Sequence, residues 1–127
     1  MKDPSALLLG GRGFIGSALA NRLCHKGWRV HVVGHSHGGY THQNIFYHPG
    51  GMEDRSLVES VLPEYAVVVH LASGSTPVSS AGKPVEEAEI NLVPALKFLD
   101  SFKNCGNRRM IFISSGGTLY GNPENVP

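Results

Sequence analysis

A cluster of glycines near the start of the chain constrains the fold more than any other feature. Residues 7–19 read LLLGGRGFIGSAL, so an apolar run meets four glycines and an amphipathic run follows. The apolar run at 5–9 predicts a short buried strand, and the amphipathic run predicts a helix over about 14–26. The apolar residues of this helix recur at helical spacing: Ile15, Ala18, Leu19 and Leu23. The glycines therefore mark a tight turn from a strand into a helix.

The rest of the chain continues the alternation of strands and helices. Further strands are predicted at 29–33, 45–48, 66–72 and 109–115, and further helices at 53–61 and 85–102. The run at 66–72 is continuously apolar, as in a parallel strand covered on both faces. Pro94 should kink the last helix, because proline deletes one backbone hydrogen bond. The order predicts an α/β fold with a doubly wound, Rossmann-type parallel sheet of about five strands.

Composition narrows the classes of partner. The 127 residues form one domain at most, carry a formal net charge of +1, and contain no apolar run long enough to span a membrane. Basic residues are scattered, which disfavours a nucleic-acid or membrane surface. Cys24 and Cys105 fall in predicted helical segments, where free thiols suit a reducing compartment. We therefore expect a cytoplasmic chain with no nucleic-acid and no membrane partner.

The glycine spacing has a chemical use. Gly11, Gly13 and Gly16 fit G-x-G-x-x-G, and Gly10 with the last two fits G-x-x-G-x-x-G. In such a turn the glycines let the backbone approach a pyrophosphate, and the helix N-terminus then faces it with free N–H groups. The sequence predicts a dinucleotide site here; the alternative is a tight turn with a purely structural role.

Four stretches in order resemble one family. These are GGRGFIG at 10–16, VVVHLAS at 67–73, the Asn91 segment AEINLVPAL, and FISSGGTLYG at 112–121. They resemble the extended short-chain dehydrogenase/reductase family, the NAD-dependent epimerases and dehydratases of nucleotide sugars. The resemblance covers almost the whole chain. It implies an NAD(P)-binding domain over 1–127, NAD or NADP as cofactor, and hydride transfer at a sugar by the bound nicotinamide, which is oxidoreductase or isomerase chemistry.

The resemblance also implies site residues. Those expected to bind the cofactor are Gly10, Arg12, Gly13, Phe14, Ile15, Gly16, His35, Met52, Leu71, Ala72, Ser73 and Asn91. The hydroxyl that polarises the substrate would come from Ser115, with Ser114 and Thr118 as alternates. These hydroxyls could instead satisfy backbone groups at the strand end.

The chain departs from the family where the choice of cofactor is made. NAD-binding members place an acidic residue at the end of the second strand to hold the ribose hydroxyls, but this position is Gly34, followed by His35. Arg12, within the glycine turn, could reach a 2′-phosphate or could be a solvated loop side chain. Met52, after Gly51 where an aspartate is usual, could cover the adenine. The sequence leaves NAD and NADP both open.

A second departure concerns catalysis. The family uses a Tyr-x-x-x-Lys pair, yet no tyrosine of this chain has a lysine four positions later. We expect an N-terminal part of a longer enzyme, without the substrate domain, that does not catalyse alone; nucleotide sugar would bind only in the full-length parent. The alternative function is a non-catalytic module that binds and senses a dinucleotide.

Two further expectations concern metals and self-association. His35, His37, His42 and His48 have no carboxylate or cysteine interleaved at ligand spacing, so we expect no metal site. The strand at 109–115 should form an open apolar edge of the sheet. Such an edge favours pairing with a second copy of the chain.

Overall fold

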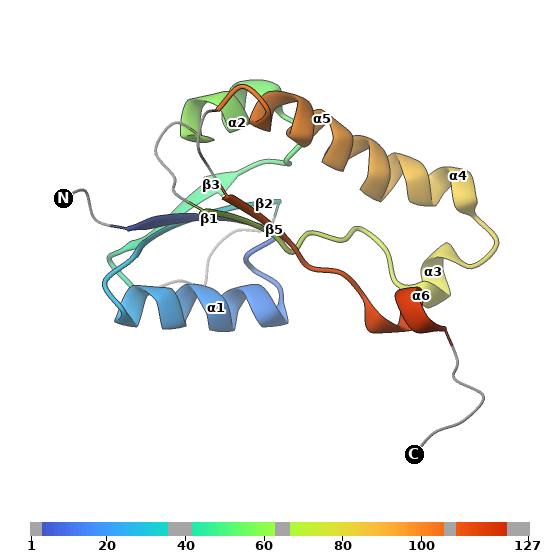
Figure 1. Ribbon diagram of the computed structural model, residues 1–127, viewed down its shortest axis with the longest axis horizontal. Coiled ribbons are helices and arrows are strands. Elements are labelled where there is room, and N and C mark those ends of the chain that lie inside the picture. The colour runs from blue at the N-terminus through green and yellow to red at the C-terminus, as the bar shows by residue number, and fades with distance from the viewer. Residues whose placement is uncertain (1–3, 36–41, 63–66, 106–108, 122–127) are drawn as a thin grey trace, which may run out of the picture.

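The computed structural model describes residues 4–35, 42–62, 67–105 and 109–121, and shows one parallel sheet between two helical layers (Figure 1). The strands are β1 Ser5–Leu9, β2 Arg29–Gly34, β3 Ile45–Pro49, β4 Val67–His70 and β5 Arg109–Phe112. Their order across the sheet is β3-β2-β1-β4-β5, and every neighbouring pair is parallel. The predicted doubly wound α/β fold is confirmed.

Helices cover both faces of the sheet. They are α1 Phe14–His25, α2 Arg55–Val61, α3 Pro77–Ser80, α4 Pro84–Glu87, α5 Val93–Phe102 and α6 Gly116–Tyr120. In Figure 1, α1 lies below the sheet, whereas α2 and α5 lie above it. The chain leaves β1 toward β2 and β3, then returns to place β4 on the other side of β1. The carboxyl ends of β1 and β4 therefore form the topological switch point of the sheet.

Each face of the sheet has its own apolar core. The upper core joins sheet residues to α2 and α5 and contains Leu7, Leu9, Val33, Met52, Val58, Val61, Leu62, Val68 and Phe98. The lower core, against α1, contains Leu8, Ala20, Cys24, Val30, Val32 and Val69. Adjacent residues of β1 alternate between the two cores, as the period of a strand requires.

The side of α1 that is buried differs from the one expected from sequence. Ile15 is 59% exposed and Ala18 is exposed, whereas the buried residues of α1 are Gly16, Ala20 and Cys24. The glycine turn brings the helix close to the sheet, so small residues occupy the contact and the larger Ile15 is displaced from it. Cys24 is a free thiol, and burial raises its pKa. Cys105 lies just after α5 rather than within it, and its thiol donates to the Ser101 carbonyl at 3.3 Å.

The long helix predicted at 85–102, with a kink at Pro94, contains a π-helical turn before this proline. α4 passes into a π-helical segment, η2 Ala88–Leu92, which passes into α5. Pro94 lies in the first turn of α5, the part of an α-helix in which proline is tolerated. The π-helical turn directly precedes it. Gly106, expected to end this helix, lies outside the described residues.

Two strands end earlier than predicted. β4 and β5 pair in register from Val67 with Arg109 to His70 with Phe112, and both then leave the sheet. Ser114 and Ser115 consequently lie in the segment after β5 rather than within it. The short helices α3 and α6, which follow β4 and β5, were not predicted. No helix within the described parts of the chain is long and apolar enough to cross a membrane.

Candidate functional site

The glycine turn lies at the switch point between β1 and β4. Gly10 has φ of +75°, and a Cβ built on it would lie 2.6 Å from the Cα of Ala72. The turn is tied to the sheet by the Gly10 N–H, which donates to the carbonyl of Val33 at 3.0 Å. Only a residue without a Cβ allows the segments after β1 and β4 to approach this closely. The crevice outside the carboxyl ends of the strands is where open α/β sheets bind ligands.

The glycine turn also packs against the first turn of α1. A Cβ on Gly16 would lie 2.5 Å from the carbonyl oxygen of Gly11, so the first turn of the helix packs on the preceding loop. Gly13 differs, since a Cβ there would meet only the Gly10 carbonyl oxygen at 3.6 Å. Gly13 is the N-cap of α1, and the N–H groups of the following turn point outward from the helix end. This is the geometry of an anion-binding turn.

Two clefts meet at this turn. The first has a volume of about 800 Å³ and the second about 1030 Å³. Both are lined by Gly10, Gly13, Leu71, Ala72, Ser73 and Asn91. All twelve residues that the sequence analysis assigned to the cofactor line one cleft or both. Three of them line only the first cleft: Arg12, His35 and Met52. Three others line only the second cleft: Phe14, Ile15 and Gly16. The two clefts together form one groove across the switch point.

Arg12 occupies the first cleft near the end of β2. Its guanidinium carbon lies 5.9 Å from the centre of the Tyr47 ring, and the Tyr47 hydroxyl donates to the Gly34 carbonyl at 2.5 Å. The Arg12 carbonyl accepts from the Ser17 hydroxyl at 3.2 Å, which fixes the backbone of the turn to α1. Arg12 Nη1 is buried and has no hydrogen-bond acceptor among the described residues. Its donor is therefore not used by the described residues, while the Arg12 side chain lines the cleft.

The floor and rim of the first cleft come from the segment after β3. Met52 lines the cleft although it is only 8% exposed, because most of its side chain is in the upper core. Glu53 reaches back over Gly51, where a Cβ would lie 2.1 Å from the carboxylate. Its Oε1 is 3.9 Å from Nε2 of the exposed His35. The first cleft thus carries a carboxylate that the sequence analysis did not assign.

Asn91 is held in the π-helical segment by three hydrogen bonds. Its Oδ1 accepts from the Gly74 N–H at 2.8 Å, and its Nδ2 donates to Ser75 Oγ at 2.7 Å and to Glu87 Oε1 at 2.9 Å. The amide therefore ties the segment after β4 to the helix across the junction of the two clefts. These partners favour a positioning role for Asn91 in addition to a place in the lining.

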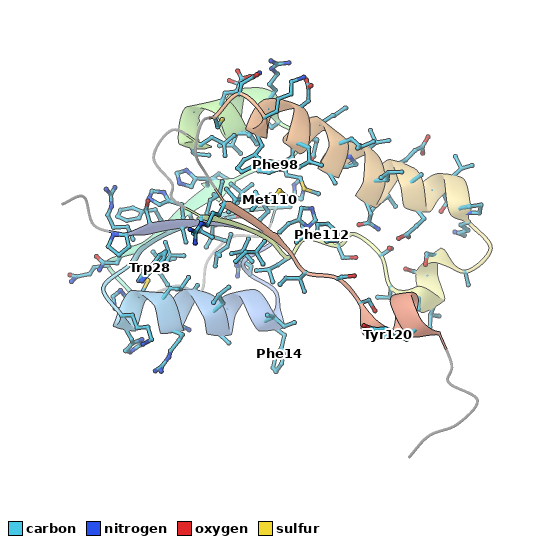
Figure 2. The ribbon with its side chains drawn as sticks, viewed as in Figure 1. Phe14, Trp28, Phe98, Met110, Phe112 and Tyr120 are labelled. Carbon is cyan, nitrogen blue, oxygen red and sulfur yellow. The ribbon has the colours of Figure 1, made fainter. Side chains whose placement is uncertain are left out.

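The second cleft is apolar and open. It is bounded by exposed side chains of η2, of α5, of the end of β5 and of the residue after β5: Leu92, Leu96, Leu99, Phe112 and Ile113. Phe14, which is 96% exposed, projects from the first turn of α1 away from the sheet (Figure 2). The three leucines recur at helical spacing, so an apolar face of the long helix lines this cleft; within α5 only Phe98 and Ser101 are buried.

The candidate catalytic hydroxyls lie at the far wall of the second cleft. Ser114 and Ser115 both line it and are exposed. Ser115 is the N-cap of α6, yet its side chain makes no capping hydrogen bond. The side chain of Thr118 lies outside what the structure describes. His70, on the same wall, is 5% exposed; burial lowers its pKa, partly offset by a backbone hydrogen bond.

The described histidines lie in three places: two line the clefts (His35 and His70), two lie together with ring centres 5.7 Å apart (His25 and His42), and two lie on β2 and β3 (His31 and His48). His31 and His48 lie on adjacent strands with stacked rings, and His31 Nδ1 is 2.8 Å from His48 Nε2. His37 lies outside the described residues. Within the described ranges no three histidine, cysteine or acidic side chains gather as a metal site would need.

Comparison with known proteins gives the family. The model of the NAD dependent epimerase/dehydratase family matches residues 6–127. The chain belongs to this family. Its sequence is 31% identical to a UDP-glucose 4-epimerase of Streptococcus mutans, over 95% of the chain and 38% of that protein. It is 32% identical to UDP-glucuronic acid decarboxylase 4 of Arabidopsis thaliana, over 95% of the chain and 28% of that protein.

Solved structures of the same family have the same fold. An epimerase from Methanothermobacter thermautotrophicus superposes with a TM-score of 0.85 at 26% identity, covering 98% of the chain and 39% of that structure. UDP-glucose 4-epimerase from Bifidobacterium longum, in complex with NAD⁺ and UDP, superposes with a TM-score of 0.84 at 28% identity, covering 97% and 40%. The chain spans less than half the length of each of these four relatives.

Sequence reasoning missed two residues of the first cleft region. Tyr47 reaches Gly34 because β3 pairs with β2, and Glu53 follows the turn that leaves β3. The weak strand pattern at 45–48 indicated β3 but not its register. The register of β3 against β2 places Tyr47 beside the end of β2.

Proposed function

We propose that this chain is the cofactor-binding part of an NAD(P)-dependent epimerase or dehydratase that acts on nucleotide sugars. The dinucleotide would lie in the groove formed by the two clefts, with its pyrophosphate at the glycine turn. The adenosine would occupy the first cleft, beside Gly34, His35 and Met52. The nicotinamide half would extend into the second cleft, toward Leu71, Ala72 and Ser73.

One observation carries the proposal: the glycine turn, the N-terminus of α1 and the switch point coincide. Gly10 permits the close contact with Ala72, and Gly13 leaves open space where the diphosphate would approach. The partial positive charge of the helix N-terminus stabilises a diphosphate there. The orphaned Arg12 Nη1 adds a cation on the adenosine side. The residues present fit a dinucleotide.

A bound nicotinamide would supply the hydride acceptor or donor at the sugar. Of the residues of this chain, Ser115 would polarise the substrate; two facts support this role, since Ser115 lines the second cleft and its side chain does not cap α6. Binding of a nucleotide sugar, the isomerase or oxidoreductase reaction, and the Tyr and Lys that it needs belong to the full-length parent in this proposal. The chain alone would bind cofactor without turnover.

The experiment is a calorimetric titration of the purified chain with NADH and with NADPH, repeated on Gly13→Ala. The open space around Gly13 predicts that alanine folds normally while its methyl group obstructs the diphosphate. We expect at least one dinucleotide to bind and Gly13→Ala to weaken it by about tenfold or more, the loss of one or two charge-assisted contacts. Gly117→Ala, at a glycine that lines neither cleft, is the matched control. Absence of binding to either dinucleotide refutes the proposal.

The second candidate is a module that binds a dinucleotide and signals its presence to a partner. The wide apolar second cleft supports it, because Leu92, Leu96 and Phe112 would be available to a partner protein. The sequence of the parent gene separates the two candidates. A continuation with Tyr-x-x-x-Lys and a substrate domain supports the enzyme, and its absence supports the module.

A further inference from the structure

The geometry points to a 2′-phosphate subsite at the adenosine end of the first cleft, so that this chain prefers NADP(H) to NAD(H). The inference rests on the proposed function, since it concerns which dinucleotide the same groove holds. The ligand class is a ribose 2′-phosphate ester. Three features carry it: the state of Arg12, the end of β2, and the balance of charge around both.

The position of Arg12 and the unused hydrogen-bond donor on its guanidinium suit the binding of a phosphate. Its guanidinium lies over the Tyr47 ring at 5.9 Å, and Tyr47 is hydrogen bonded to Gly34, the last residue of β2. The Arg12 backbone is fixed by Ser17. Nη1 is buried without an acceptor among the described residues, a state that costs free energy until an anion arrives. A guanidinium binds a phosphate, as it binds a carboxylate, with two parallel hydrogen bonds.

The end of β2 lacks the group that would reject a 2′-phosphate. A carboxylate there accepts hydrogen bonds from the two ribose hydroxyls and repels a phosphate. Gly34 has no side chain, and a Cβ built on it meets nothing within 4 Å. The space beside Gly34 is therefore open, and Arg12, whose guanidinium lies over the Tyr47 ring, lines the same cleft.

The remaining charges at this end do not reverse the preference. Glu53 is the one carboxylate that the described residues bring to this end of the cleft, and it lies 3.9 Å from His35. It comes from the loop after β3 and folds over Gly51, rather than from the end of β2. Arg12 and His35 can therefore both face the phosphate while Glu53 remains beside His35.

The first test compares ligands on the unmodified chain by calorimetry at low salt: NADPH with NADH, and 2′,5′-ADP with 5′-AMP. The second pair isolates the subsite, since its members differ only in the 2′-phosphate. We expect each phosphorylated ligand to bind about tenfold to a hundredfold more tightly, as one or two charge-assisted contacts imply. Equal or tighter binding of NADH overturns the inference and leaves the proposed function intact. No binding of either dinucleotide overturns both.

Three variants assign the preference to residues. Arg12→Ala should remove it, lowering the affinity for 2′,5′-ADP by about tenfold or more relative to that for 5′-AMP; Arg22→Ala, an exposed arginine of α1, is the control. Gly34→Asp, which the open space accommodates, should reverse the preference in favour of NADH. Glu53→Gln should not weaken NADH. A wild-type preference that survives Arg12→Ala, or a loss of NADH binding in Glu53→Gln, would contradict the assignment.

Discussion

The stability of the chain should fall in mild acid because of the histidine pair at the β2–β3 edge. Burial, with the neighbouring His48 and Arg29, lowers the pKa of His31 from 6.5 to about 4, and burial lowers the pKa of His48 as well. A lowered pKa means that the unfolded chain binds more protons between those two values, so stability is complete above about pH 6.5 and is lost as the pH falls toward 4.

The size of this effect follows from the same numbers. A pKa of about 4 in place of 6.5 corresponds to roughly 3 kcal/mol for His31, which is 6% exposed and therefore little screened. Urea titrations at pH 7.5, 6.0 and 5.0 should show about 2 kcal/mol of this loss by pH 5.0, as a lower midpoint at constant slope. His31→Leu with His48→Leu removes both partners together and should abolish most of the pH dependence, whereas His25→Leu, on the exposed side of α1, should not. If the double variant loses stability in parallel with the unmodified chain, the reasoning is refuted.

Two other predictions follow from the clefts. Asn91→Ala removes two hydrogen bonds from η2 to the segment after β4 and a third to Glu87 of α4, and should cost about 1–3 kcal/mol in thermal or urea unfolding. Amide exchange at Gly74 should become faster; unchanged exchange there would argue against the positioning role. The edge strand β5, in which Phe112 is 62% exposed, should pair with β5 of a second copy of the chain. Sedimentation velocity at tens of micromolar should therefore show a dimer, and Phe112→Lys should dissociate this dimer. A chain that stays monomeric throughout would contradict this prediction.

The strands and the first helix could be predicted from the sequence because they depend on local sequence patterns. The glycine turn announces a strand followed by a helix, and the buried strands are unbroken apolar runs, so β1, β2 and β4 were placed to within two residues at each described end. Strand lengths were less accurate, because β5 ends where its partner β4 ends, and pairing is not a local property.

The site was predictable where it depends on the backbone and unpredictable where it depends on register or burial. The glycines, Arg12 and Asn91 could be assigned from spacing and resemblance. Tyr47 and Glu53 could not, because β3 and the loop after it acquire their place only by pairing with β2. Helical periodicity identified the Leu92–Leu96–Leu99 stripe as apolar, but periodicity does not say what an apolar face meets, and here it lines an open cleft.

The central claim is that a dinucleotide binds at the glycine turn, and amide chemical-shift mapping by NMR tests it most directly. Titration of the ¹⁵N-labelled chain with NADPH should move the amide signals of Gly11, Gly13 and Ile15 at the start of α1, together with Ala72 across the switch point. Signals from the far end of α1, such as Arg22, should remain in place. Binding that leaves the glycine turn unshifted and moves signals elsewhere would contradict the account.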